Sequence, residues 1–224
     1  MDFIFDSGLV LYLPLYERDG SSFMSKDAYG HLYTVTGALW TPRGRSFDGS
    51  DDYVTIPDHA AFDIATKLTF LSWVKSDVVA SVADQDYIAS KYATDEREWA
   101  FRTLNTGVLA IYFGDPNDGS FEGRVESDVA HITSTTTYYL VGFTFSSGTV
   151  VLYVNGAAVD SSTATGAVPA TLYNGSADIL IGNTADLGVG QFWDGLQGEV
   201  WLYSRALTFL EIQHIYLATK WRYR

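Results

Sequence analysis

The sequence predicts an all-β protein, a two-sheet antiparallel jelly-roll sandwich with one short helix near the C-terminus. Short runs of β-branched and aromatic residues alternate with Gly, Asp, Asn and Ser along the chain, which is the pattern of strands joined by turns. Aromatic residues make up 15% of the 224 residues and glycines number 20, a composition that suits pleated sheets and tight turns. Only one segment has convincing helical spacing, and no repeat of about 40 residues indicates a propeller.

The expected strands are short and apolar. In chain order they cover residues 9–15, 31–36, 53–56, 68–75, 87–91, 99–104, 108–113, 121–126, 138–145, 150–154, 179–181 and 197–203. Asn155-Gly156 lies between two apolar runs, which is the strongest short-range signal of a hairpin. With the turn residues at 146–149, it predicts a three-stranded meander over 138–159. A second hairpin is expected at 104–108, whereas the small residues at 161–170 indicate a loop.

The expected helix begins near residue 208. Thr208 is suited to the N-cap position, and Glu211 stands three residues later, as a capping box requires. Leu210, Ile212 and Ile215 form an apolar stripe near helical spacing. Because the segment is short, we expect the helix to dock on the sandwich.

Length, charge and cysteine content limit the classes of function. All-β sandwiches of this length are routinely single domains, so residues 1–224 are expected to form one domain. The chain has no cysteine, which excludes disulfides and thiolate metal sites. The formal net charge of −13 opposes binding to nucleic acid or to anionic membranes. No apolar run approaches the roughly 20 residues that span a bilayer, and the start lacks the basic region of a signal peptide. We expect an extracellular or virion protein, and the sequence does not show a route of export.

Four segments carry a resemblance to a known family. They are Phe47-Asp48-Gly49-Ser50-Asp51-Asp52-Tyr53-Val54-Thr55-Ile56-Pro57, Phe70-Leu71-Ser72-Trp73-Val74-Lys75, Leu152-Tyr153-Val154-Asn155-Gly156, and residues 195–207 with Glu211-Ile212. Together they resemble laminin-G-like jelly-roll domains of the concanavalin A-like lectin/glucanase superfamily, in the right order over most of the chain. The resemblance implies two stacked antiparallel sheets in which the N- and C-terminal strands are neighbours.

The chain departs from the family at two positions. Many relatives carry Asp where Gly198 stands, and in some of them that Asp ligates a structural calcium ion. Gly198 has no carboxylate, which puts that particular site in doubt. Tyr138 takes the place of a Trp that is usual in the meander.

One strand contains an approach to a catalytic motif. Retaining glycosidases of the same superfamily carry Glu, Asp and Glu at alternate positions of one strand. Here Glu122, Arg124 and Glu126 have this spacing, so alternation places all three on one face. Arg124 would hold both carboxylates ionised, whereas a general acid needs a raised pKa. The segment is interpreted as a row of ion pairs, and the protein is predicted not to be an enzyme.

Two groups of oxygen-bearing residues are candidate calcium ligands. Calcium takes six to eight oxygens from carboxylates, carbonyls and amides. Asp48, Asp51 and Asp52 form one acidic cluster, to which Asp194 would contribute from another strand, and Asp115 with Asn117 forms another in a hairpin-like loop. A solvated turn is the competing interpretation of each. A structural calcium ion is the only cofactor expected.

Sugar-binding sites combine an aromatic platform with amides and carboxylates. The aromatic residues near expected loops are Trp99, Tyr112, Phe121 and Trp193. Any one of them is also a candidate for the core. Trp40, Trp73 and Trp201 are assigned to the core or to the sheet faces.

Three functions remain open from the sequence. The first is a non-catalytic binding module that recognises carbohydrate or a protein surface. The second is a structural component of a phage or virus virion, as a decoration or tail protein in an oligomer or assembly. The basic segment Lys220-Trp221-Arg222-Tyr223-Arg224 would then dock on a neighbour. The third is a glycoside hydrolase whose Glu-x-Arg-x-Glu site is degenerate.

Overall fold

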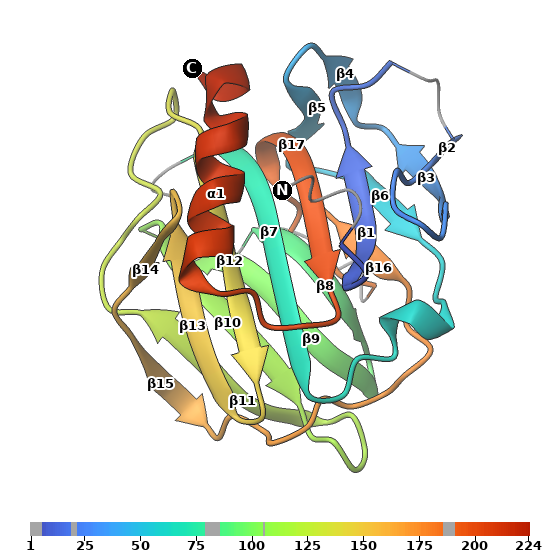
Figure 1. The fold of residues 1–224 in the computed structure, drawn as a ribbon, viewed down its shortest axis with the longest axis vertical. Helices are drawn as coiled ribbons and strands as arrows, with labels where there is room; N and C mark the ends of the chain where they lie inside the picture. The colour runs from blue at the N-terminus through green and yellow to red at the C-terminus, as the bar shows by residue number, and fades with distance from the viewer. Residues whose placement is uncertain (1–5, 19–21, 79–85, 105, 186–190) are drawn as a thin grey trace.

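The computed structural model describes residues 6–18, 22–78, 86–104, 106–185 and 191–224. In this part of the chain two antiparallel sheets, of eight and nine strands, pack face to face (Figure 1). The eight-stranded sheet has the order β14 (Ala157–Val159), β13 (Thr149–Val154), β12 (Tyr139–Ser146), β7 (Lys67–Ser76), β17 (Asp194–Tyr203), β5 (Gly44–Asp48) and β4 (Leu39–Thr41), with β1 (Leu9–Pro14) also paired to β17. The nine-stranded sheet has the order β15 (Ser161–Gly166), β11 (Phe121–Ser127), β10 (Val108–Gly114), β9 (Glu96–Leu104), β8 (Tyr87–Ala93), β16 (Ile179–Ile181), β6 (Tyr53–Ile56), β3 (Leu32–Thr36) and β2 (Ser22–Met24).

The jelly-roll prediction is confirmed, together with its main connections. β1 and β17, the first and last strands, are antiparallel neighbours. β12, β13 and β14 form the predicted meander. Asn155 and Gly156 both have positive φ, 52° and 80°, which the tight turn between β13 and β14 requires. β9 and β10 form the second hairpin, although Asn105 in its turn lies outside the described residues.

The structure corrects the prediction of a loop at residues 161–170. Residues 161–166 form β15, which pairs with β11 at the edge of the nine-stranded sheet. Its side chains are small, and nearly all are exposed. An edge strand with no buried face has no apolar alternation, so the pattern that identifies inner strands is missing here.

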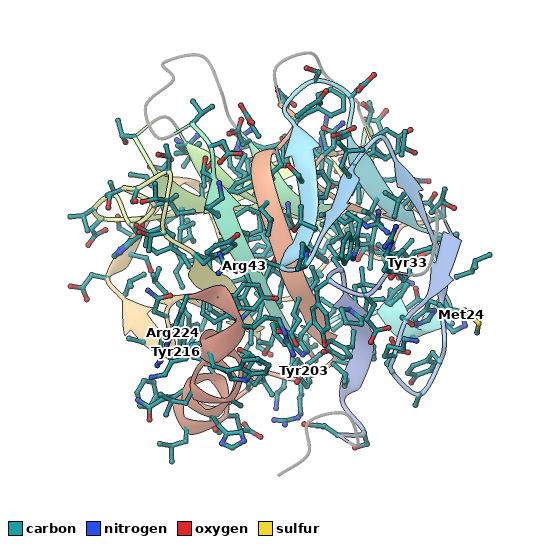
Figure 2. All side chains as sticks on the ribbon, turned by 90° about the horizontal axis from the view of Figure 1, so that it is seen from above. Met24, Tyr33, Arg43, Tyr203, Tyr216 and Arg224 are labelled. Atoms are coloured by element: carbon teal, nitrogen blue, oxygen red, sulfur yellow. The ribbon has the colours of Figure 1, made fainter. Side chains whose placement is uncertain are left out.

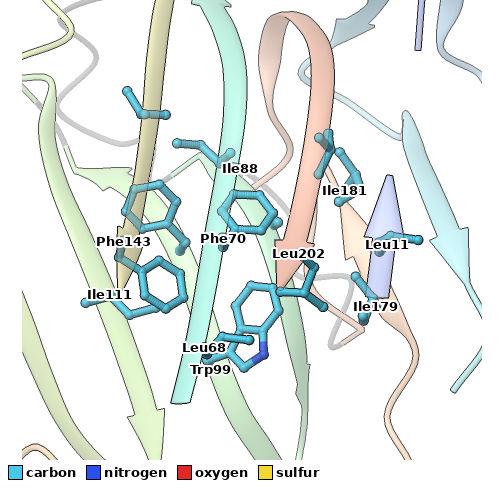
Figure 3. Packing of buried hydrophobic residues seen from close by; sticks show 14 of the residues in the cluster. Leu11, Leu68, Phe70, Ile88, Trp99, Ile111, Phe143, Ile179, Ile181 and Leu202 are labelled. Carbon is cyan, nitrogen blue, oxygen red and sulfur yellow. The ribbon is translucent and has the colours of Figure 1, made fainter. Parts of the chain in front are cut away.

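Alternation along the strands separates the two faces of the nine-stranded sheet. One row of cross-strand neighbours belongs entirely to the core between the sheets: Val54, Ile181, Ala89, Phe101, Ile111 and Val125. From the opposite sheet, Phe70 and Phe143 pack on the Trp99 ring with ring centroids 5.6 and 5.8 Å apart (Figure 3). Residues one position along each strand from this row therefore point away from the core, except Ile88, which stays in the core where β8 is irregular between Tyr87 and Ala89.

The eight-stranded sheet is covered on its other face by the helix α1 (Phe209–Thr219) (Figure 1). The predicted capping box is present, because the Thr208 side chain accepts from the Glu211 amide and the Glu211 carboxylate accepts from the Thr208 amide. Ile212 and Ile215 are buried against the sheet in a second apolar cluster that includes Trp73 and Trp201. The prediction that the helix docks on the sandwich is confirmed.

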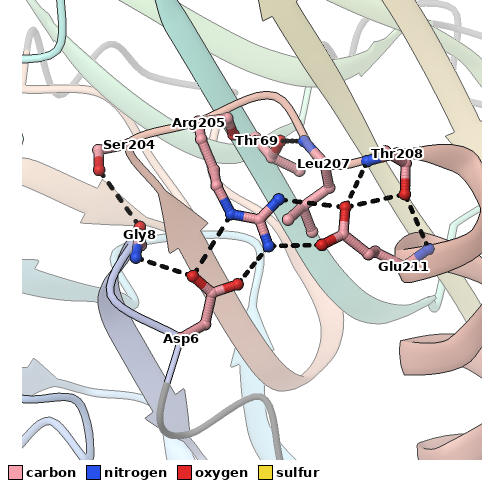
Figure 4. A network of polar contacts seen from close by, with 8 residues as sticks. All are labelled: Asp6, Gly8, Thr69, Ser204, Arg205, Leu207, Thr208 and Glu211. Carbon is pink, nitrogen blue, oxygen red and sulfur yellow. Dashed lines mark hydrogen bonds and ion pairs between the residues drawn. The ribbon is translucent and has the colours of Figure 1, made fainter. Parts of the chain in front are cut away.

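Arg205 ties the two ends of the chain to this helix (Figure 4). Its guanidinium donates to both Glu211 carboxylate oxygens, at 3.1 and 2.6 Å, and also contacts the Asp6 carboxylate. The hydrogen bonds from Arg205, followed by those from Thr208, lower the pKa of Glu211 to about 2. The Ser-Arg-Ala-Leu segment after β17 therefore has a structural role, which is to hold the helix start and the N-terminal strand together.

The C-terminal residues dock on their own chain. η3 (Lys220–Tyr223) continues from α1, and Tyr223 is buried with its ring 4.4 Å from that of Trp73. Arg222 donates to the buried Glu199 at 2.6 Å. Arg43 reaches the Arg224 carbonyl at 2.6 Å, and both residues lie beside the end of the helix (Figure 2). In the described ranges, no helix has the length and apolar character needed to cross a membrane.

Candidate functional site

The outward face of the nine-stranded sheet contains a row of polar and aromatic side chains. Across five strands the row reads Leu180, Ser90, Ala100, Tyr112 and Arg124, each residue directly opposite the next. A parallel row contains Tyr87, Arg102, Ala110 and Glu126. Ala100 and Ala110 are small, which leaves room for the larger tyrosine and arginine side chains to lie across them.

Two arginines stack with tyrosines on this face. We define Tyr87, Arg102, Tyr112 and Arg124 as the Arg–Tyr cluster. The Arg102 guanidinium lies 5.1 Å from the Tyr87 ring centroid and 4.0 Å from that of Tyr112, and it donates to both hydroxyls. Arg124 lies 5.3 Å from the Tyr112 ring and donates to its hydroxyl at 2.8 Å. Because each contact of this kind contributes roughly 0.5–2 kcal/mol, the cluster is well ordered before any ligand arrives.

Phe121 provides an exposed ring next to the cluster. It opens β11, is 41% exposed, and lies with its ring centroid 6.0 Å from that of Tyr112. The structure therefore brings together two of the four aromatic residues that the sequence selects as ligand candidates.

The other two aromatic candidates lie in the core, which corrects their selection as ligand-binding residues. Trp99 and Trp193 are 2% and 0% exposed and belong to the cluster between the sheets. Trp99 lies directly opposite Phe113 and so points inward. Neither ring is accessible to a sugar. Proximity to a loop in the sequence does not report which face of a strand a side chain occupies.

The Glu-x-Arg-x-Glu segment has the predicted alternation. Glu122, Arg124 and Glu126 are all partly exposed, while Gly123 and Val125 between them are buried. Arg124 Nε lies 2.6 Å from Glu126 Oε1. The arginine thus engages one carboxylate and the Tyr112 hydroxyl at once, so one of the two expected ion pairs is present among the described residues.

A shallow groove lies further along the same sheet. It has a volume of about 370 Å³ and is lined by Tyr53, Thr55, Ser176, Asp178, Leu180 and Ala185. Thr55 and Leu180 are cross-strand neighbours in the outward row, whereas Ser176 and Asp178 come from the loop before β16. The sequence alone does not reveal this groove, because no local pattern places the loop with Ser176 and Asp178 beside β6.

A buried ionic cluster lies behind this loop. Lys91 is fully buried in the inward row, between Ile179 and Trp99. Its ammonium contacts the Glu98 carboxylate and lies 3.1 Å from Asp58 Oδ1. Glu98 enters the same space because β9 bulges at this residue, with Trp99 and Arg97 paired to consecutive residues of β8.

The same pair holds the loop backbone. Lys91 donates to the Gly175 carbonyl at 2.8 Å, and Glu98 accepts from the Gly175 amide at 3.0 Å. Burial raises the pKa of Glu98 to about 7, against the opposing effect of the Lys91 charge. The cluster therefore positions one wall of the groove.

Three carboxylates gather at the turn between β5 and β6. One oxygen from each of Asp48, Asp51 and Asp52 lies within 4.8 Å of the others. Asp194 stands opposite Asp48 in the pairing of β17 with β5. Burial, followed by the charges of Asp48 and Asp51, raises the pKa of Asp52. The structure thus brings together the three acidic residues that the sequence groups as one cluster.

The second predicted group of calcium ligands lies elsewhere. Asp115 and Asn117 are in the loop between β10 and β11 of the nine-stranded sheet. Asp115 Oδ1 accepts from both the amide and the side chain of Asn117, each at 2.7 Å. These bonds form a turn, and the structure does not bring this pair together with Asp48, Asp51 and Asp194.

Comparison with known proteins agrees with this geometry. The two packed antiparallel sheets define a jelly-roll sandwich. A family model described as the concanavalin A-like lectin/glucanases superfamily, of the laminin-G kind, matches residues 48–213. The chain belongs to this superfamily, and the resemblance stated from the sequence is confirmed. No curated protein matches the chain.

Solved structures show the same fold at low sequence identity. The Trypanosoma rangeli sialidase in complex with sialic acid is 18% identical with a TM-score of 0.69, covering 98% of this chain and 34% of that one. The binding domain of botulinum neurotoxin DC in complex with rat synaptotagmin II is 13% identical with a TM-score of 0.66, covering 94% and 51%. The botulinum neurotoxin serotype D ligand binding domain in complex with N-acetylneuraminic acid is 15% identical with a TM-score of 0.67, covering 94% and 51%. This chain thus spans about half of the toxin domains and a third of the sialidase.

Proposed function

We propose that this protein is a non-catalytic binding module that recognises carbohydrate through the outward face of the nine-stranded sheet. The exposed Phe121 ring beside Tyr112 and Arg124 is the observation that carries the proposal. Sugars bind to aromatic rings through their apolar C–H faces and to arginine and carboxylate groups through their hydroxyls. Such a module would act outside the cell or on a virion, where glycans are displayed.

A protein surface is the alternative ligand for this face. The similar solved structures include one complex with N-acetylneuraminic acid and one with a protein receptor. A sheet face with buried tyrosines beside the partly exposed Arg124 suits either, because tyrosine and arginine are enriched at binding hot spots. The polar row of small and charged side chains favours carbohydrate.

Replacing Phe121 by Ala is expected to weaken glycan binding at least tenfold, since the ring supplies the exposed apolar contact of the site. A glycan array followed by calorimetry on the best ligand measures this loss. Phe209→Ala is the matched control, because Phe209 is 45% exposed on α1, away from the sheet face. Equal affinity of Phe121→Ala and the unchanged protein would contradict the proposal.

We infer that the protein does not hydrolyse glycosides. Arg124 forms an ion pair with Glu126 at 2.6 Å and stands where the glycosidases of the superfamily carry the central acid of the motif. Hydrolysis of β-glucans that disappears in Glu122→Gln and Glu126→Gln would instead establish the glycosidase alternative.

We also propose that Asp48, Asp51 and Asp52, with Asp194 beside them, hold a structural calcium ion. Three carboxylates with oxygens within 4.8 Å repel one another, and a divalent cation with oxygen ligands would relieve that repulsion. Such an ion would fasten the β5–β6 turn to the start of β17.

Calcium at ten times its dissociation constant is expected to add about 1.4 kcal/mol to the free energy of unfolding, and so to raise the melting temperature by about 3–6 °C. EDTA should reverse the shift. Asp51→Asn should abolish the shift. Asp115→Asn, in the loop between β10 and β11, should leave the shift unchanged. A melting temperature that does not respond to calcium in the unchanged protein excludes the site.

A second candidate function is a structural component of an assembly. Leu210, Leu217 and Trp221 are 71%, 51% and 64% exposed, and their spacing places them along one side of α1 and η3. A helix that is apolar on both sides gains stability when its free side is also covered. We expect self-association in sedimentation velocity that Leu217→Gln reduces, and a monomer at all concentrations would contradict this candidate.

A further inference from the structure

The hydroxyl of Tyr112 has two donors and no acceptor among the described residues. Arg102 and Arg124 both donate to it. A tyrosine hydroxyl accepts through its oxygen and donates one hydrogen. Because both arginines use the oxygen, the O–H bond must be directed to an acceptor that the described protein groups do not supply. Two cationic donors also polarise this hydroxyl, which makes it a stronger donor.

The charge beneath this hydroxyl belongs to Arg102. Arg102 is 5% exposed, and no carboxylate in the described ranges lies within ion-pair distance of it. Its Nε atom is also buried without a partner there. Lys91, which is also fully buried, has two carboxylates beside it. A buried charge without a counter-ion is costly, and an anion placed nearby recovers part of that cost.

Arg124 extends this positive charge to the surface. Its side chain is 30% exposed and has Glu126 on one side. Arg102 and Arg124 bring two positive charges to this face, and the carboxylates of Glu122 and Glu126 lie on the same face of β11 as Arg124. The exposed Phe121 ring closes the site on the side of the Tyr112 ring.

We propose that the ligand of this face is an acidic sugar, a monosaccharide unit whose carboxylate accepts from the Tyr112 hydroxyl and the Arg124 guanidinium while its ring packs on Phe121. A carboxylate matches the planar donor geometry of arginine better than a sugar hydroxyl does. Glu122, two residues from Arg124 on the same face, accepts hydrogen bonds from the sugar hydroxyls. This inference rests on the proposed carbohydrate-binding function and adds the class of sugar.

Pairs of glycans that differ only in the carboxylate provide the test. We would measure calorimetric affinities for 3′-sialyllactose and for hexagalacturonate, each against its own carboxyl-reduced form. In at least one pair, the acidic member is expected to bind at least tenfold more tightly, and added salt should reduce the difference. Tyr112→Phe and, separately, Arg124→Gln should bring its affinity to that of the neutral member.

Arg124→Gln keeps the test valid if loss of the Tyr112 hydroxyl destabilises the fold around Arg102. Tyr153→Phe, a buried tyrosine on the other sheet, is the matched control and should bind as the unchanged protein does. Equal affinity for both members of each pair, with binding still lost in Phe121→Ala, overturns the inference and leaves the proposed function standing. Absence of binding to every glycan overturns both.

Discussion

Replacing Lys91 by Met is expected to lower the free energy of unfolding by about 3–5 kcal/mol at pH 8, because it leaves the carboxylate of Glu98 buried without its cation. The Glu98 side chain is 1% exposed, and Lys91 is the group that contacts it. Urea denaturation measures the loss. Lys75→Met is the matched control, since the Lys75–Asp77 pair is partly exposed, at 19% and 46%, and should contribute about 1 kcal/mol or less.

The cost of Lys91→Met should depend on pH. In the folded protein the pKa of Glu98 is raised to about 7 from 4.5, so between these values the folded state binds more protons than the unfolded state. The stability that Glu98 contributes is therefore fully present below pH 4.5 and is lost as the pH rises through 7. At pH 5 Glu98 avoids a buried charge by protonation, and the variant should lose less than at pH 8. The double variant Lys91→Met/Glu98→Leu should recover most of the loss, and an equal cost at both pH values would contradict this account.

Replacing Trp73 by Ala is expected to cost about 3–5 kcal/mol and to release the C-terminal helix from the sheet. Trp73 is 2% exposed on the central strand β7. Its ring stacks on Tyr223 and Tyr216, and its indole nitrogen donates to Thr219 Oγ1 at 2.8 Å. One side chain thus contacts both α1 and η3. Hydrogen exchange of the α1 amides measures the release, which should exceed the change in the amides of β9 and β10.

Two further variants separate the hydrogen bond of Trp73 from its ring contacts and provide a surface control. Trp73→Phe keeps an aromatic ring and removes the hydrogen bond, so it should cost about 1–3 kcal/mol. Trp221→Ala, at a ring that is 64% exposed, should change the stability by about 0.5 kcal/mol or less. If the α1 amides exchanged at unchanged rates in Trp73→Ala, the helix would be held by other contacts.

The parts of the fold that the sequence predicted are those with local causes. Asn155-Gly156 tolerates positive φ, so the meander was visible from two residues and their apolar flanks. Thr208 and Glu211 bond to each other's backbone three residues apart, and this spacing identifies a helix start without any tertiary contact. β15 was missed because both of its faces are exposed and its pairing with β11 is a long-range contact.

The candidate site was predicted only in part, for the same reason. The alternation of Glu122, Arg124 and Glu126 depends on one strand alone, and it is confirmed. The contact between Arg102 of β9 and Tyr112 of β10 depends on the register of a hairpin, which no single segment specifies. Trp99 and Phe121 are both aromatic residues next to loops, yet one is buried and the other exposed. The proposed calcium site and acidic-sugar site stay predictions until they are measured.

The sequence by itself determined the architecture, since period-two alternation, turn residues and a capping box act over a few residues. Only the tertiary structure decided which side chains share a surface. Three contacts join residues that are separated in the sequence. A bulge turns Glu98 toward Lys91, the strand register places Arg102 against Tyr112, and Tyr223 packs on Trp73. Burial and charge pairing are properties of these tertiary contacts and not of any one segment. The face that we propose to bind sugar can therefore be identified only from the assembled sheets.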